Sequence, residues 1–255
     1  KDKQISQLVD YVDANDLFPE VDIPGGVCYF LWEKDSEGDC LVKNIIKGVE
    51  YESTRPLNQF DTFVRHSPAV AILSKVMAFK ERSITEIVSA TRPFGLQTKD
   101  RPDGKGTIRL VSSGGEGKIA LSRVTAGKDL VRKWKVLTSK TSHDHGGNPD
   151  KQGMRRVLSR LEILEPNAVC TESYIVIGSF ESREEAENCH SYLQTKFVRH
   201  LISILSFSQD ITRERFRYVP IQDFTKNWSD LALYKKYKIN ESEIKFIESV
   251  IKEMG

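Results

Sequence analysis

The stretch 169–224 constrains the fold more than any other part of the chain, because it orders a strand, a long helix and a second extended segment. Its beginning, VCTESYIVIGSF, has the β-branched and aromatic density of a strand, and Gly178 marks a point where that strand could stop. Ser182 and Glu185 then have the spacing of a capping box. Apolar residues follow at intervals of three or four, which predicts an amphipathic helix of about six turns. These residues are Ala186, Cys189, Leu193, Phe197, Leu201 and Ile204.

A polar turn, a basic run and a short strand are predicted after this helix. The turn is Gln209–Thr212, and the short strand, in YVPIQDF, is ended by Pro220. Between them, Arg213, Arg215 and Arg217 alternate along the chain. If this run is extended, the three arginines share one face and form a basic ridge. Such a ridge could clamp phosphate groups, or it could be an exposed strand edge kept soluble by its charge.

The first 46 residues predict strands at QLVDYV and GVCYFLWE, with a further edge strand at CLVKNI. The near-continuous apolar character of the second is typical of a strand buried on both faces. Two buried strands with so little chain around them do not make a stable domain by themselves. We therefore expect them at the far edge of a sheet whose other strands lie upstream, with Glu50–Phe60 as a linker.

Helix start signals occur on both sides of the central region. They are Ser67-Pro68, Ser83 with Glu86 for a short helix SITEIVSA, Ser229, and Asn240 with Glu243. Apolar stripes at helical spacing follow the first and the last of these signals. The stripes are Ala69, Ile72, Val76 and Phe79 in one helix, and Ile244, Ile247 and Val250 in the other. The last two helices form a tail that we expect to pack onto the rest of the protein.

The middle of the chain is basic and rich in glycine. Residues 99–160 hold 15 Lys and Arg against 6 Asp and Glu, a charge of +9, so the rest of the chain carries −7 of the total of +2. Short strands are predicted here at TIRLV, KIALS and WKVLTSK, separated by glycine-containing loops. A basic region between acidic ones suggests a surface that faces a polyanion, although charge alone equally fits a set of solvated loops.

The segment 139–156 carries the side chains that nucleic-acid contacts use. Lys, Arg and small hydroxyl residues bind phosphates, and Arg, Asn and Gln read base edges. His143 and His145 could also bind Zn, but a third ligand at usable spacing is missing. A nucleophile–base pair of Ser142 and His143 lacks an orienting acid, and a nuclease centre lacks clustered carboxylates. The segment therefore favours DNA contact, with no metal and no catalytic group assigned.

The cysteines and the apolar runs indicate a cytoplasmic protein. Cys28, Cys40, Cys170 and Cys189 are scattered, without a CxxC pair, and we expect them to be reduced core thiols. No run approaches the ~18 apolar residues of a membrane span. The start, KDKQISQLVDYV, has no apolar signal region and no initiator Met, which suggests the middle of a longer polypeptide.

The order of strand, helix, polar Gln-Asp-Ile-Thr turn and YVPIQDF resembles the target-recognition domains of DNA restriction–modification proteins. These domains occur in type I specificity subunits and at the C-terminal end of fused type II adenine methyltransferases. The tail DFTKNWSDLALYKKYKINESEIKFIESVI is similar to the ending of the fused enzymes. Together with the basic loops, the resemblance implies double-stranded DNA as the partner. The implied DNA contacts are Arg92, Lys99, Arg101, Lys140, Ser142, His143, His145, Lys151, Arg155, Arg156, Gln209, Arg213 and Arg215.

The pattern LVDYV…LFPEVDIPGGVCYFLWEK resembles the last strands of adenine-N6 DNA methyltransferases. By this resemblance, Phe18 corresponds to an aromatic that stacks on the flipped-out adenine, whereas a loop anchor against the sheet edge is the simpler interpretation. The whole enzyme would take its methyl group from S-adenosylmethionine. The 255 residues contain no Asn/Asp-Pro-Pro-Tyr motif and no FxGxG-type cofactor loop. We therefore assign no cofactor to this chain and do not expect it to methylate DNA by itself.

The expected fold is a mixed α/β (α+β) one in three parts. Residues 1–58 would be the last strands of a methyltransferase sheet and a linker, 59–225 the DNA target-recognition domain, and 226–255 a helical tail. The expected function is sequence-specific DNA recognition within a restriction–modification adenine methyltransferase. Its partners would be the upstream methyltransferase domain of the same polypeptide and a nuclease domain or subunit, with no membrane. The alternative is a non-catalytic module whose basic loops contact a protein or RNA.

Overall fold

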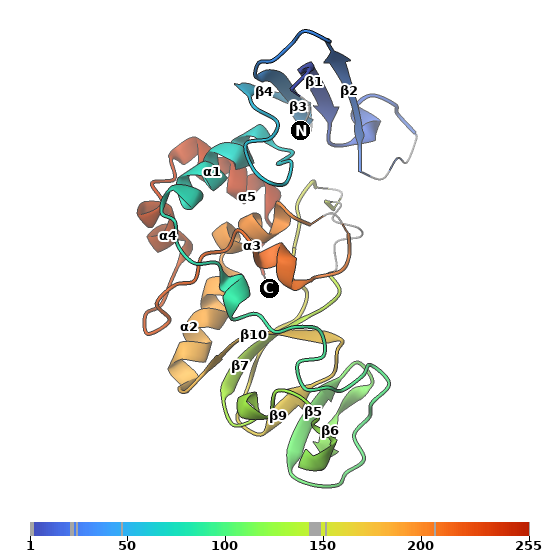
Figure 1. The fold of residues 1–255 in the computed structure, drawn as a ribbon, viewed down its shortest axis with the longest axis vertical. Coiled ribbons are helices and arrows are strands. Elements are labelled where there is room, and N and C mark those ends of the chain that lie inside the picture. Colours follow the sequence, from blue (N-terminus) through green and yellow to red (C-terminus); the bar gives the residue numbers. More distant parts are fainter. Residues whose placement is uncertain are drawn as a thin grey trace. The chain divides into compact units, whose positions relative to one another are not determined.

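The computed structural model of the chain describes residues 3–20, 23, 25–46, 48–142, 149–150, 152–206 and 208–254 (Figure 1). The chain divides into two compact units, residues 1–75 and 76–255. The described residues form five α-helices and three β-sheets. This mixture of helices and sheets confirms the expected mixed α/β class.

A four-stranded sheet forms most of the first unit. Its strands are β1 (Ile5–Tyr11), β2 (Val27–Trp32), β3 (Cys40–Ile46) and β4 (Val49–Arg55), in the order β2-β1-β3-β4. β1 runs parallel to β3 and antiparallel to β2, and β3 and β4 form an antiparallel hairpin. Two expectations are therefore wrong. The strand at CLVKNI is internal, and the expected linker 50–60 begins as β4 because its residues complete that hairpin.

β2 is the largest departure from the expected burial. It pairs only with β1 among the described strands, and it was expected to be buried on both faces. Four consecutive large apolar residues are instead about half exposed: Tyr29 by 56%, Phe30 by 57%, Leu31 by 47% and Trp32 by 48%. Cys28 is also exposed and free, so only Cys40, Cys170 and Cys189 are the buried thiols expected. A continuous apolar run shows that a strand is suited to burial on both faces. It does not supply the neighbouring elements, and no described element covers β2.

Buried polar contacts join the sheet of the first unit to the start of α1 (Ser67–Ala78). The Asp10 carboxylate accepts two hydrogen bonds of 2.8 Å from the Arg65 guanidinium and one of 3.1 Å from the Asn44 amide. Asn44 Oδ1 in turn accepts a hydrogen bond of 2.9 Å from the Ser67 backbone N–H. The expected helix at 67–80 is thus confirmed, except that Phe79 lies beyond its end and is 43% exposed.

The second unit contains two three-stranded sheets. One has the order β10-β7-β8 and the other β6-β5-β9. The bounds of the strands are β5 Ile108–Ser112, β6 Gly115–Ile119, β7 Trp134–Ser139, β8 Leu161–Leu164, β9 Ala168–Cys170 and β10 Tyr174–Phe180. The strands expected at TIRLV and WKVLTSK are confirmed. The strand expected at KIALS ends at Ile119, and a one-turn 3₁₀ helix follows at Leu121–Arg123.

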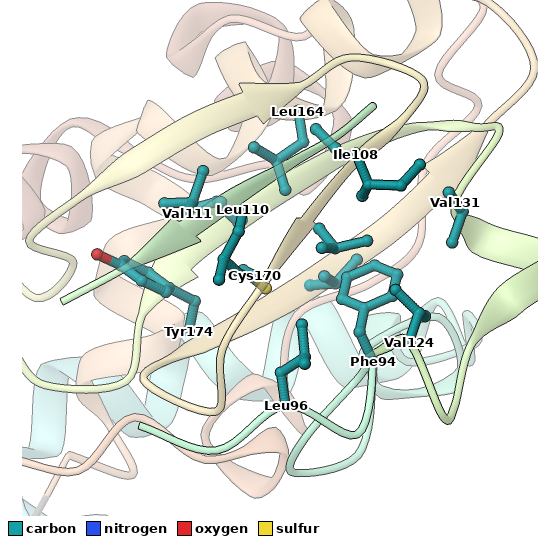
Figure 2. Close-up of a cluster of buried hydrophobic side chains, with 14 of the residues drawn as sticks. Phe94, Leu96, Ile108, Leu110, Val111, Val124, Val131, Leu164, Cys170 and Tyr174 are labelled. Atoms are coloured by element: carbon teal, nitrogen blue, oxygen red, sulfur yellow. The ribbon is translucent and has the colours of Figure 1, made fainter. Parts of the chain in front are cut away.

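An apolar core fills the second unit between these strands. Leu110 of β5, Leu137 of β7 and Val176 of β10 are at most 1% exposed, and they pack with Phe94 and Leu96 of a preceding loop. Figure 2 shows side chains from both sheets and from this loop gathered in one cluster. Burial raises the pKa of the Cys170 thiol in the same cluster to about 12, so this thiol stays protonated.

Lys135 is a fully buried charge beside this core. Its Nζ lies 2.5–3.4 Å from the carbonyl oxygens of Leu130, Val131, Lys133 and Glu165. Burial lowers the pKa of the ammonium to about 8. Its three N–H donors are shared among three carbonyls of the turn 130–133 and the Glu165 carbonyl, which is how buried polar groups are satisfied in native proteins.

The long helix expected after Ser182 is two helices, α2 (Arg183–Gln194) and α3 (Lys196–Ser203). The capping box of Ser182 and Glu185 is confirmed. Thr195 interrupts the helix with φ −58° and ψ 146°, and its side chain accepts a hydrogen bond of 3.2 Å from the Val198 N–H. All the expected apolar positions are buried except Ile204, which is partly exposed.

The strand expected at YVPIQDF does not form. Arg213–Phe216 is a 3₁₀ helix, and the chain near Pro220 makes only an isolated bridge to Ser83. The short helix expected after Ser83 is a single 3₁₀ turn, Ile84–Glu86. β10 also continues past Gly178, which has φ +78° at a register shift, so this glycine marks a bulge.

The two C-terminal helices are α4 (Asp230–Lys236) and α5 (Glu241–Val250). Both expected caps, Ser229 and the capping box of Asn240 and Glu243, are confirmed. The helices are tied to the rest of the second unit by polar contacts. Tyr237 donates a hydrogen bond of 2.5 Å to the Glu81 carboxylate, and Lys236 lies 2.6 Å from the same carboxylate.

Candidate nucleic-acid interface

Three of the residues expected to contact DNA meet where β7 ends. The Ser142 N–H donates to the Gln209 carbonyl at 2.8 Å, and the Ile211 N–H donates to the Lys140 carbonyl at 2.7 Å. These bonds form a short antiparallel bridge between residues 140–142 and 209–211. Gln209 is exposed, and Lys140 and Ser142 are partly exposed. We call these two paired segments the stem.

Arg155 and Arg156 lie beside the stem. The Ser142 hydroxyl donates to the Val157 carbonyl at 2.9 Å, which links their segment to the stem. On its other side, the Arg155 N–H donates to the Val250 carbonyl at 2.8 Å, and its carbonyl accepts from the Lys252 N–H at 2.9 Å. The backbone of Arg155 is therefore held by the end of α5, and both arginines are partly buried.

Arg92, Lys99 and Arg101 come from a loop that reaches the stem through Glu172 and Ser173. The Lys140 N–H donates to the Ser173 carbonyl at 2.9 Å. Next to it, the Glu172 carboxylate pairs with Arg92 and accepts from the Thr98 N–H at 3.1 Å. The bond from Arg92, that from Thr98 and the charge of Lys140 lower the pKa of Glu172. Lys99 is exposed, and Arg101 donates to the Thr98 and Asp100 carbonyls.

The basic ridge of three arginines does not form, because the segment is a 3₁₀ helix and not a strand. Arg213 Nε donates to the Thr85 carbonyl at 2.7 Å, and Arg217 pairs with Glu214 at 2.7 Å. Arg215 is only 5% exposed and donates to the Ser208 carbonyl and hydroxyl at 2.8 Å. Burial lowers the pKa of Arg215, and its guanidinium forms hydrogen bonds within the protein.

Several other cations of the basic region are neutralised by carboxylates. Arg109 pairs with Glu116, Glu162 and Glu165, Arg160 with Glu116 and Glu162, and Arg123 with Asp100 and Asp103. Within the described part of the region, the cations that form no ion pair are Lys99, Arg101, Lys105, Lys118, Lys128, Arg132 and Lys140, besides the buried Lys135. The charge available to a polyanion is therefore smaller than the sequence suggests and is carried mainly by lysines.

His143, His145 and Lys151 lie outside the described residues. Beside them, Asp150 Oδ1 accepts hydrogen bonds from the N–H groups of Gln152 and Met154, and Asp150 Oδ2 lies 3.2 Å from Lys252 Nζ. Among the described residues, no group of three His, Cys, Asp or Glu side chains could hold a metal ion.

Phe18 belongs to the first unit. It follows a 3₁₀ turn, Ala14–Asp16, that Asp13 caps. Its N–H donates to the Ala14 carbonyl at 2.8 Å, and its side chain is 46% exposed. The ring is thus about half exposed, which suits stacking and packing against the sheet edge equally. A role in stacking on adenine stays a prediction.

A pocket in the first unit does not fit S-adenosylmethionine. Its volume is about 170 Å³, and its lining includes Lys3, Glu37, Asp39, Cys40 and Asn58. Sites for drug-sized ligands usually have about 300–1,000 Å³. We assign no chemical step to this pocket.

Two residues that shape this region, Val157 and Arg199, could not be identified from the sequence. Val157 has a φ of +71°, which β-branched residues rarely adopt. Arg199 is 1% exposed on α3, between Val198 and His200, which are also buried. A pattern of apolar residues predicts neither a left-handed backbone nor a buried guanidinium, because both depend on contacts with distant segments.

Comparison with known proteins gives a short similarity. No family model matches the chain. A stretch of 42 residues is 38% identical to an uncharacterized adenine-specific methylase of Mycoplasma pneumoniae, and it covers 16% of this chain and 10% of that protein. The match thus spans about a tenth of the relative's length. Among the described helices, none has both the length and the apolar character that a membrane span requires.

Proposed function

We propose that residues 76–255 recognise double-stranded DNA, as the target-recognition domain of an adenine-specific DNA methyltransferase of a restriction–modification system. The observation that carries this proposal is the stem. Segments 140–142, 155–157 and 209–211, which are far apart in the chain, are joined by hydrogen bonds of 2.7–2.9 Å. The similarity to an adenine-specific methylase supports the methyltransferase part of the proposal.

The side chains at the stem suit the two kinds of contact that protein–DNA interfaces use. Lysines without an ion pair, such as Lys99 and Lys140, would bind phosphates, which position the duplex. Gln209 is exposed and could make a bidentate contact to adenine in the major groove. Glu172, between Arg92 and Lys140, would keep this surface from binding phosphate uniformly, because it neutralises part of the local charge.

The methyl transfer itself would belong to a methyltransferase domain that supplies S-adenosylmethionine. The sheet edge at β2 supports a role for the first unit beside such a domain. Both faces of β2 expose aromatic and aliphatic side chains, and one of its edges has no described partner. A neighbouring strand would pair with that edge, and its flanking layers would cover the exposed side chains. Phe18 would then contribute an aromatic surface for the extruded adenine.

A salt titration with the 255-residue chain tests the proposal. Duplex DNA of random sequence and a duplex selected from a randomised pool would be compared by fluorescence anisotropy. We expect affinity to fall by about tenfold or more between about 50 and 200 mM salt, because each phosphate contact releases counterions. We also expect tighter binding of the selected duplex. Absence of duplex binding at low salt would refute the proposal, and preferential binding of RNA would favour the interaction-module alternative.

A further inference from the structure

The backbone turn at Val157 is strained and buried. Val157 has a φ of +71° and is 1% exposed, and the Leu158 N–H donates to the Arg156 carbonyl at 2.9 Å. A hydrogen bond from residue i+2 to residue i with a positive central φ defines the rare type of γ-turn. For a β-branched residue this conformation is a genuine outlier, and it persists only where the surroundings hold it.

Side chains from two other segments donate hydrogen bonds to the Arg156 and Val157 carbonyls, which flank the strained φ angle of Val157. The Ser142 hydroxyl donates to the Val157 carbonyl at 2.9 Å. The Arg199 guanidinium donates to the Arg156 carbonyl at 3.3 Å. The turn is therefore fixed from the stem on one side and from α3 on the other.

Arg199 joins three segments at once. It is 1% exposed, and its Nε donates to the Gln194 carbonyl at 3.0 Å at the end of α2. The nitrogen that reaches Arg156 also donates to the Lys252 carbonyl at 2.6 Å. Since the Lys252 N–H donates to the Arg155 carbonyl, Arg199 acts on both arginines of the candidate interface. A guanidinium supplies several donors in a rigid fork, which a lysine ammonium does not reproduce.

We propose that Arg199 and the turn at Val157 are positioning residues for DNA recognition, and that they set the direction in which the Arg155 and Arg156 side chains project beside the stem. This proposal rests on the proposed function. Neither positioning residue touches DNA. Each acts through the backbone of residues 155–157, so its loss changes discrimination between sequences more than it changes the number of phosphates bound.

Two variants of the full chain test this role, Arg199→Lys and Val157→Gly. Lysine keeps the charge but loses the fork, and glycine adopts a positive φ without strain while leaving the turn free to change. The probes are a 20-base-pair duplex selected by the wild-type chain from a randomised pool and a scrambled duplex of the same composition. We expect the ratio of the two affinities to fall about tenfold, the scale of one lost base contact, with an unchanged salt slope.

Arg183→Lys is the matched control, because Arg183 is exposed at the start of α2, away from the stem. Its described contacts are an ion pair with Glu187 and a cation–π contact with the Trp134 ring. The control should keep the ratio of the wild type. If the wild type itself does not discriminate between duplexes, the proposed function fails. If the wild type discriminates and folded Val157→Gly does so equally, the positioning role fails. Should Arg199→Lys not fold, Val157→Gly decides alone, because glycine is compatible with the backbone observed there.

Discussion

Lys140, which belongs to the stem, and Arg215, which follows it in the chain, have opposite environments. Lys140 forms no ion pair among the described residues, whereas Arg215 is 5% exposed and donates two hydrogen bonds of 2.8 Å to Ser208. We expect Lys140→Ala to weaken duplex binding and to reduce the salt slope by about one, with an unchanged melting temperature. Arg215→Ala should instead destabilise the fold by about 1–3 kcal/mol, because it removes a buried side chain together with its two hydrogen bonds to Ser208.

Anisotropy titrations at several salt concentrations and thermal unfolding separate these effects. Lys226→Ala serves as a control, since Lys226 is a lysine of the second unit that pairs with Asp223 at 3.4 Å and lies outside the stem. A lower melting temperature in Lys140→Ala, or an unchanged one in Arg215→Ala, would contradict the assignment of surface and interior.

His200 makes the free energy of unfolding of the protein depend on pH. Its ring is 2% exposed, packs edge-on against Phe246, and has no hydrogen-bond partner for either nitrogen among the described residues. Burial and the nearby charge of Arg155 lower its pKa from 6.5 to about 3. Between the two pKa values, His200 therefore binds a proton in the unfolded state and stays neutral in the folded state. Stability is full above the unfolded pKa and falls as pH drops from about 6.5 towards 3, by several kcal/mol in total, at about 1.4 kcal/mol for each tenfold difference in proton affinity.

His200→Leu tests this effect, because leucine removes the titrating group and keeps an apolar side chain. Urea unfolding at a series of pH values from 7 to 4 should show a shallower loss of stability for the variant than for the wild type. Carboxylates that titrate in the same range affect both proteins alike. Parallel curves would show that His200 does not contribute.

At the level of elements, the start of α3 depends on a residue from α4. The Asp230 carboxylate accepts hydrogen bonds from the N–H groups of Lys196 at 3.1 Å and Phe197 at 2.8 Å. It satisfies donors that a helix start leaves free, and its charge suits the positive end of the helix dipole. We expect Asp230→Ala to lower the free energy of unfolding by about 1–2 kcal/mol in urea titrations.

Glu184→Ala is the comparison for that variant, because Glu184 is exposed in the first turn of α2, whose N–H groups Ser182 and Glu185 already cap. An equal loss of stability in both variants would mean that Asp230 acts only through general charge. A larger loss for Asp230→Ala would establish the cross-element cap.

The capping boxes of α2 and α5 were predictable from the sequence, and features that need a distant partner were not. The capping boxes at Ser182 and Asn240 are confirmed, because a cap involves residues three apart. The break at Thr195 was missed, since it is held by Asp230, 35 residues away. The exposure of β2 was also missed, because hydrophobicity measures what a residue prefers and not what is present to cover it.

The candidate site was predictable in composition but not in geometry. The sequence indicated that Lys140, Ser142 and Gln209 belong to one surface, and hydrogen bonds bring them together. It did not indicate that Arg215 is turned inward, because a 3₁₀ turn and an extended strand have the same alternating arginines in sequence. The ion pairs of Arg109 and Arg160 involve residues up to 56 positions away and could not be inferred from charge counts.

At the level of the molecule, the division into two units predicts that DNA binding is separable. A fragment of residues 67–255 keeps the whole of α1 and all of the second unit. We expect it to bind duplex DNA with the affinity and salt slope of the full chain, because the candidate interface lies within residues 76–255. A loss of more than about tenfold, about 1.4 kcal/mol, in a folded fragment would show that the first unit takes part in binding. Circular dichroism of the fragment is the control for folding.

The buried Lys135 side chain also offers a chemical measure of how often the second unit opens locally. Four carbonyl oxygens surround it, and its pKa of about 8 leaves much of the amine neutral in mildly alkaline solution. Neutral amines react readily with acylating reagents, but a side chain with 0% exposure meets a reagent only when the surrounding turn opens. The rate at which Lys135 becomes labelled, read by mass spectrometry against the exposed lysines, would therefore count the openings of this core. Lys135 stabilises the turn through its hydrogen bonds, and its rate of labelling would also report how often these bonds break.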